Sequence, residues 1–308
     1  MQLSFRWLGA EDTITLEHIS QIPGMRAVAA TVQHIPVGDV WGIGSILNLR
    51  KQIEDAGMAF DVIESIPVHE HIKLGRADRN QYIENFCENI RRAAAAGIKC
   101  ICYDFMPLYE WEAHYTREEQ KKLMNEYRSV GEKGLWENLC YFIERMIPVA
   151  VECNVNMAIH PDDIYWKSAG VPHILSDEAH LSRFLKLADV AHNGLTFCIG
   201  SLGCTSKQDV AEMAAKYAAM GRIHYVHLGN AEETGLGAKE KAHTSESGFL
   251  DMHAILKALY DNGFDGYIRP DRGRMIWGET GKPGTGFYDR ALGATYIGGL
   301  WEGIIKTR

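Results

Sequence analysis

Four side chains of the types that bind transition metals follow four apolar segments of the 308-residue chain, namely His160, Cys198, His227 and Asp271. Two imidazoles, a thiolate and a carboxylate suit Mn²⁺, Fe²⁺, Co²⁺ or Zn²⁺, whereas Ca²⁺ and Mg²⁺ prefer sites made of oxygen alone. The same four ligands could close a structural zinc site. At the mouth of a fold, however, they would leave room for substrate oxygens, and the cation could act as a Lewis acid.

Apolar, β-rich runs alternate with amphipathic stretches from end to end of the chain. We expect strands at Leu3–Leu8, Arg26–Val32, Asp61–Ile66, Ile98–Phe105, Asn156–His160, Gly194–Gly200, Ile223–Leu228 and Gly266–Pro270. We expect helices at Thr15–Ile22, 46–56, Gln81–Ala96, 116–153 with a break near Gly131 and Gly134, Asp177–Val190, Gln208–Met220, Asp251–Asn262 and Tyr288–Ile304.

Strands that alternate with helices predict a parallel sheet, because each crossover between parallel strands needs a helix. Eight such units predict a closed (β/α)₈ TIM barrel, as a single α/β domain over residues 1–308. A doubly wound open sheet is the alternative. A GxGxxG turn after the first strand would favour it, but that turn reads Leu8-Gly9-Ala10-Glu11-Asp12.

The carboxyl ends of barrel strands form one rim, where TIM-barrel active sites lie. The four metal-binding residues are therefore expected to meet there. Other residues at or just after strand ends are candidates for substrate contact, namely Arg6, Trp7, Glu64, Asp163 and Asn230, and Tyr103 is a candidate catalytic residue. Of the neighbours Arg6 and Trp7, one should face the barrel and the other should pack outward. Of Asp162 and Asp163, one should orient a ligand imidazole and one should cap a loop.

The formal net charge of −8 and the pI of about 5.9 argue against nucleic acid and weakly against an anionic membrane as partners. No run of roughly 18 apolar residues predicts a membrane span. The first residues lack a signal-peptide pattern. Seven cysteines without a CxxC pair predict reduced thiols in a cytoplasmic protein. We expect a small-molecule substrate and a homo-oligomer.

Short motifs follow one another in order along nearly the whole chain: FRW (5–7), QIPG (21–24), IPVGDVW (35–41), ESIPVHE (64–70), FMP (105–107), IPVA (147–150), AIHPDD (158–163), CIGSLG (198–203), RIHYVHL (222–228), GYIRPDRGRMIWGE (266–279) and FYDRALGATYIGGLWE (287–302). In these motifs the chain resembles the D-mannonate dehydratase family of xylose-isomerase-like TIM barrels. The resemblance implies dehydration of D-mannonate to 2-keto-3-deoxy-D-gluconate in hexuronate breakdown, with Mn²⁺ or Fe²⁺ as cofactor. It places the metal ligands on the same four residues.

That reaction removes a proton from carbon 2 and expels the 3-hydroxyl as water, so it needs a base and an acid. The family's acid/base pair is a His after the metal-binding Asp and a Tyr in a Pro-Gly-Tyr-Gly loop, where this chain has Arg272 and Thr285. Arg272 is a candidate catalytic residue at this position, although a guanidinium stays protonated and is a poor base. Gly229 replaces an arginine of the family, and Arg272 could supply the lost cation as a clamp for the substrate carboxylate.

Two further departures concern the end of the fourth strand. Asp104 stands where the family has Asn, and residues 110–113 replace an Asp-Trp-Thr-Arg run, after which this chain is shorter than its relatives. Because the departures gather at the rim, two alternatives to the dehydratase stay open. One is a metal-dependent isomerase or epimerase of a related sugar or sugar acid. The other is a non-catalytic, metal-binding paralogue.

Overall fold

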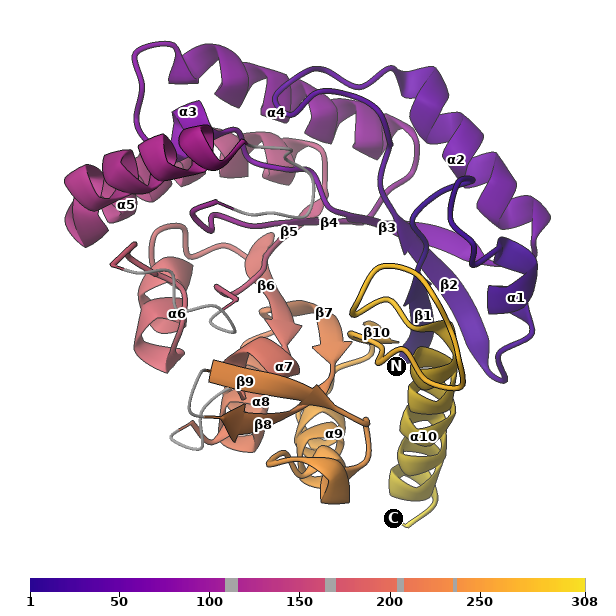
Figure 1. The fold of residues 1–308 in the computed structure, drawn as a ribbon. Helices are drawn as coiled ribbons and strands as arrows, with labels where there is room; N and C mark the ends of the chain where they lie inside the picture. The colour runs from indigo at the N-terminus through magenta and orange to yellow at the C-terminus, as the bar shows by residue number, and fades with distance from the viewer. Residues whose placement is uncertain (109–115, 164–169, 204–207, 235–236, 308) are drawn as a thin grey trace.

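A computed structural model describes residues 1–108, 116–163, 170–203, 208–234 and 237–307. Its parallel strands are β1 (Gln2–Arg6), β2 (Met25–Ala30), β3 (Ala59–Glu64), β4 (Cys100–Tyr103), β5 (Asn156–Ile159), β6 (Asn193–Cys198), β7 (Ile223–Leu228) and β10 (Tyr267–Pro270). They close into one barrel in the order β1-β10-β7-β6-β5-β4-β3-β2, which the helices surround (Figure 1). The predicted (β/α)₈ barrel is confirmed, and every strand prediction fell within a few residues of its element.

The helices follow the predicted pattern. They are α1 (Leu16–Ser20), α2 (Ile43–Asp55), α3 (Glu70–Lys73), α4 (Arg79–Ala95), α5 (Arg117–Glu152), α6 (Glu178–Leu185), α7 (Ile199–Leu202), α8 (Val210–Ala219), α9 (Met252–Asp261) and α10 (Phe287–Lys306). The predicted break in α5 lies at Gly131, whose φ of 65° and ψ of 177° are not helical. Asp251 caps α9, because its carboxylate accepts the amide of Ala254 at 3.0 Å.

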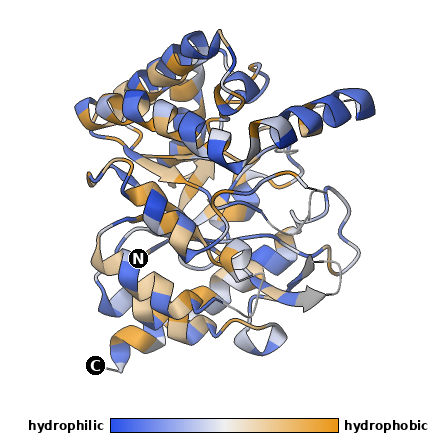
Figure 2. Ribbon diagram, turned by 90° about the vertical axis from the view of Figure 1, so that its left-hand side faces the viewer, coloured by the Kyte–Doolittle hydropathy of each residue, from blue (hydrophilic) through white to orange (hydrophobic). Residues whose placement is uncertain are grey.

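Strand alternation sorts the side chains into two layers. Ala29, Val62, Cys102, Ala158 and Tyr225 are among the buried residues that fill the barrel interior. The larger apolar core lies between the strands and the helices, whose surfaces mix hydrophobic and hydrophilic residues (Figure 2). This period of two decides which residue at each strand end can reach the rim.

Several short elements were not predicted. The antiparallel hairpin β8 (Asn230–Thr234) and β9 (Gly237–Lys241) follows β7 directly, and a short 3₁₀ helix at Ser245–Ser247 follows the hairpin. The short helices α3 and α7 were missed as well. The hairpin segments are polar and lack an apolar face, so their sequence gave no strand signal.

In the part of the chain that the structure describes, no helix is both long and apolar enough to span a bilayer. Six cysteines are free thiols there, and Cys204 lies outside the described residues.

Candidate metal centre and active site

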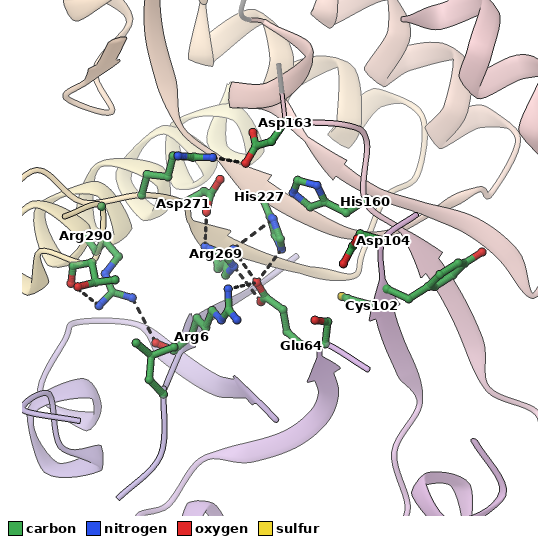
Figure 3. A pocket seen from close by; sticks show the side chains of 16 residues that line it. Arg6, Glu64, Cys102, Asp104, His160, Asp163, His227, Arg269, Asp271 and Arg290 are labelled. Atoms are coloured by element: carbon green, nitrogen blue, oxygen red, sulfur yellow. Dashed lines mark hydrogen bonds and ion pairs between the residues drawn. The ribbon is translucent and has the colours of Figure 1, made fainter. Parts of the chain in front are cut away.

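A polar cavity opens at the carboxyl ends of the barrel strands. The cavity is lined by side chains from β1, β3, β7 and β10 and from the segments that follow β4, β5 and β10. Arg290 of α10 reaches the cavity from outside the barrel (Figure 3). Parallel strands of similar length end at one edge, so residues far apart in the sequence meet here.

Three of the four predicted metal ligands converge at this rim. One donor atom from each of His160, Cys198 and His227 lies within 4.8 Å of the others. Cys198 and His227 stand opposite each other in the register of β6 and β7. Asp271 joins them through Cys198, whose thiol donates to the Asp271 Oδ2 at 3.5 Å.

The donor atoms fit a transition-metal cation. His160 shares a 2.7 Å hydrogen bond between Nδ1 and the carbonyl of Pro161, which makes Nδ1 the protonated nitrogen and leaves the lone pair on Nε2. The buried Nε2 of His227 has no hydrogen-bond partner among the described residues and lies 3.4 Å from the Glu64 Oε1. Burial and the nearby Asp271 raise the pKa of the Cys198 thiol, and a bound cation would reverse that by favouring the thiolate. Two imidazoles, a sulfur and an adjacent carboxylate suit Mn²⁺, Fe²⁺, Co²⁺ or Zn²⁺.

The buried Arg269 of β10 holds this group together. Its guanidinium donates to both oxygens of Glu64, at 2.9 and 2.7 Å, and to the Asp271 Oδ1 at 2.6 Å. It also lies 3.2 Å from the His227 Nδ1. Burial opposes ionisation of Glu64 and of Asp271 and is the largest single effect on each. Arg269 and His227, with Arg6 at Glu64 and Arg272 at Asp271, together outweigh it and hold both pKa values well below the usual range. Both side chains are therefore carboxylates at neutral pH.

Of the two substrate-contact residues predicted at the end of β1, Arg6 and Trp7, one faces the cavity and the other faces away from it. Arg6 lines the cavity, with its guanidinium 3.5 Å from the Glu64 carboxylate. Trp7 faces the other way and is buried in the core between strands and helices. The substrate-binding prediction for Trp7 is therefore wrong, because alternate residues of one strand point to opposite sides of the barrel.

Tyr103 and Asn230 also differ from their predicted roles. The Tyr103 ring packs edge-on against Phe86 and Phe142 in the outer core, and its hydroxyl has no hydrogen-bond partner among the described residues. Burial raises the pKa of Tyr103 well above its usual value, which argues further against proton transfer. The buried Asn230 amide bonds backbone groups, accepting from Leu250 and donating to Thr244, so it fixes the loop after β7.

Asp163 and Arg272 form the outer side of the cavity. Arg272 donates to the Asp163 carboxylate, and it reaches Glu240 of the hairpin at 3.0 Å. Asp163 is also held by the Ser201 hydroxyl at 2.8 Å. Thr285 lines the same side, but its hydroxyl donates to the backbone carbonyl of Lys282. Arg272 thus joins three rim segments, and two carboxylates already balance its charge.

Neither aspartate after His160 orients that imidazole, which contradicts the expectation that one would. The carbonyl of Pro161 does so. Asp162 is buried and accepts the backbone amides of Ile174 and Leu175, so it holds a loop as expected for one of the pair.

Sequence reasoning missed two charged residues of the cavity. Arg269 sits inside an apolar strand, where a charge is unusual, and that was its signal. Arg290 is buried beside the cavity and donates to the carbonyls of Arg6, Thr285 and Gly286. Burial, with Arg269 nearby, lowers the pKa of Arg290 to about 10, so it stays charged at neutral pH.

A closed parallel barrel with a candidate metal site and a polar cavity where its strands end defines the class of (β/α)₈-barrel enzymes. The model of the D-mannonate dehydratase (UxuA) family matches residues 1–119 and 112–308. The chain belongs to the mannonate dehydratase family. It is 42% identical to a mannonate dehydratase of Streptococcus agalactiae, with 99% of each chain covered, and 43% identical to one of Thermotoga maritima, covering 100% of this chain and 99% of the relative.

Solved structures agree with this assignment. A mannonate dehydratase from Streptococcus suis superposes with a TM-score of 0.95 at 42% identity, over 100% of this chain and 95% of the other. A D-tagatose 3-epimerase-like protein, at 15% identity and a TM-score of 0.66, shares the fold. The two sequence alignments run over 345 and 356 residues, so the relatives contain internal segments that this chain lacks. The two matched parts of the family model overlap at residues 112–119, next to residues 110–113, where we expected the shortening and which lie outside the described residues.

Proposed function

We propose that the chain is a hydro-lyase that dehydrates D-mannonate to 2-keto-3-deoxy-D-gluconate in hexuronate breakdown. One observation carries the proposal. The His160, Cys198 and His227 cluster, with Asp271 beside it, lies at the strand ends of a chain that aligns along its whole length with relatives named mannonate dehydratase.

We propose His160, Cys198, His227 and Asp271 as ligands of Mn²⁺ or Fe²⁺, with Co²⁺ or Zn²⁺ as alternatives. The cation would supply positive charge for the negative charge that develops on substrate oxygens when the carbon-2 proton leaves. Arg269 keeps Glu64 and Asp271 ionised and fixed. Such preorganised charges lower the barrier because they need no rearrangement during the reaction.

The arginines at the cavity suit an anionic substrate. We infer that Arg6 and Arg272 orient the sugar-acid carboxylate, while Glu64 and Asp163 hold the two guanidiniums in place. A guanidinium matches the planar carboxylate through two parallel hydrogen bonds.

The test is turnover by protein loaded with Mn²⁺ under anaerobic conditions. Proton NMR of D-mannonate should show loss of the carbon-2 and carbon-3 signals and appearance of the carbon-3 methylene of the keto-deoxy acid. The same experiment with His227→Ala protein controls for contaminating enzyme. An unchanged substrate spectrum would contradict the proposal.

A second candidate activity is isomerisation or epimerisation of a related sugar or sugar acid. It is favoured by Arg272 and Thr285, because neither can donate a proton readily to a leaving hydroxyl. Such a reaction needs the proton abstraction but expels no water. In the same NMR experiment it would yield an isomer of the substrate, without the carbon-3 methylene signal. Binding of the sugar acid without any turnover would indicate a metal-binding paralogue.

We also propose a homo-oligomer. Trp277 is 73% exposed, and its ring centroid lies 5.5 Å from that of the exposed Tyr288, next to the exposed Leu292 of α10. Exposed apolar side chains that gather in this way are typical of subunit contacts. Light scattering should give a multiple of 34.6 kDa, and a mass of 34.6 kDa would contradict the proposal.

A further inference from the structure

The carboxylates at the cavity differ in how their oxygens are used. Both oxygens of Glu64 bond Arg269, and the two oxygens of Asp271 face Arg269 and Cys198. Asp163 is held by Arg272 on one oxygen and by Ser201 on the other. These three side chains are therefore fixed as charged partners of other residues.

Asp104, directly after β4, is different. Its Oδ1 accepts the backbone amide of Met106 at 3.2 Å and lies 3.6 Å from the Lys73 Nζ. Its Oδ2 has no hydrogen bond or ion pair to any residue within the described ranges. The side chain lies at the cavity wall near His160 without pairing with it (Figure 3). One oxygen thus anchors the carboxyl group, and the other is available to a ligand.

The charged groups around Asp104 come from α3 and from the segment after β5. Lys73 of α3 is buried and divides its bonds between the Met106 carbonyl at 2.8 Å and Glu70 at 3.3 Å. Burial raises the pKa of Asp104, Lys73 and then His160 oppose this, and Glu70 adds to it. A carboxyl group can both accept and release a proton.

Other groups of the cavity are poorly suited to proton transfer. Arg272 remains protonated, and the hydroxyl of Thr285 is bonded to a backbone carbonyl. Tyr103 turns its ring into the outer core. Among the described residues that line the cavity, Asp104 is the carboxyl group whose outer oxygen faces open space.

We propose that Asp104 is the catalytic residue that carries the proton in this chain, with Lys73 as its positioning residue. This inference rests on the proposed dehydration. The Asp104 Oδ2 takes the proton from carbon 2, and the electrons of that C–H bond form the C2=C3 double bond as the C3–O bond breaks. The same oxygen returns the proton to the departing hydroxyl, which leaves as water. The resulting enol becomes the 2-keto acid, so atoms and charge balance without a further reactant.

The matched variant is Asp104→Asn, because an amide oxygen can keep the contacts of Oδ1 to Met106 and Lys73 while losing the acid/base function. We expect kcat for D-mannonate to fall about 10²- to 10⁴-fold, with KM and the bound metal within about twofold of wild type. The control is Asp61→Asn at the opposite end of the barrel, where Asp61 bonds Lys99 and Tyr267, and its kcat should stay near wild type.

A second variant separates proton transfer from packing. In Asp104→Ala, added formate can occupy the vacated space, and it should restore part of the lost kcat with a dependence on formate concentration. A structural role would show no such rescue.

The outcomes are distinguishable from failure of the proposed function. Release of the keto-deoxy acid by wild type together with near-normal kcat in Asp104→Asn would overturn the role of Asp104 and leave the dehydratase standing. Loss of bound metal in Asp104→Asn, or no formate rescue, would also overturn it. A wild type that dehydrates no sugar acid would overturn both proposals.

Discussion

Removing the Arg269 guanidinium should destabilise the protein strongly, and Arg269→Met is the direct perturbation. Methionine keeps much of the side-chain length but leaves Glu64 and Asp271 as buried carboxylates without their main cation. Loss of one partner from a buried charge network costs about 3–5 kcal/mol. The exposed pair of Lys51 and Asp55, joined at 2.7 Å on α2, is the control, because such i,i+4 pairs contribute about 0.3–0.5 kcal/mol.

The assay is urea unfolding followed by tryptophan fluorescence, in a chelator so that no metal compensates for the missing charge. The pH dependence provides a second test. Arg269 lowers the pKa of both Glu64 and Asp271, so its stabilising contribution is complete above the ordinary carboxyl pKa of about 4. It is lost as the pH falls through the depressed folded-state values.

The difference in unfolding free energy between wild type and Arg269→Met should therefore be full at pH 7 and should shrink below about pH 4. A loss of less than about 1 kcal/mol at pH 7, similar to that in Lys51→Ala, would refute the reasoning. So would a difference that does not change with pH.

Four other substitutions test the placement of individual side chains. His227→Ala should abolish metal binding, measured by elemental analysis, whereas His224→Ala should retain the metal, because His224 lies on the other face of β7 beside Gly194. Tyr103→Phe should leave kcat within about twofold of wild type, and a larger loss of kcat would indicate that Tyr103 takes part in catalysis. Asn230→Ala should lower the unfolding free energy by at least about 2 kcal/mol with KM unchanged, since its buried amide bonds backbone groups away from the cavity. A changed KM with normal stability would contradict that assignment.

The barrel could be predicted because its signals are local and repeat. Each strand is a short apolar run, and each helix carries an apolar stripe, so the order of elements follows from the sequence. The rim followed from that order, because parallel strands end at one edge. His160, Cys198 and His227 converge for this reason.

The direction of side chains at strand ends was harder to predict. Where a strand ends within one residue of the expected position, the inward and outward sides exchange. Tyr103 was assigned to the cavity although its ring packs in the outer core, and the sequence left open which of Arg6 and Trp7 faces the barrel. Pairings between distant segments also leave no local signal. The bonds of Arg269 to Glu64 and of Arg272 to Asp163 depend on closure of the barrel and on loops that carry no regular pattern.

We propose that one catalytic cation is bound at the carboxyl ends of the strands by His160, Cys198, His227 and Asp271. Anomalous X-ray scattering from crystals grown with Mn²⁺ tests it most directly. We expect one strong anomalous peak at about 2.0–2.3 Å from the nitrogen and oxygen donors and slightly farther from the Cys198 sulfur. A peak bound elsewhere, or no peak in crystals of protein whose activity requires Mn²⁺, would contradict it.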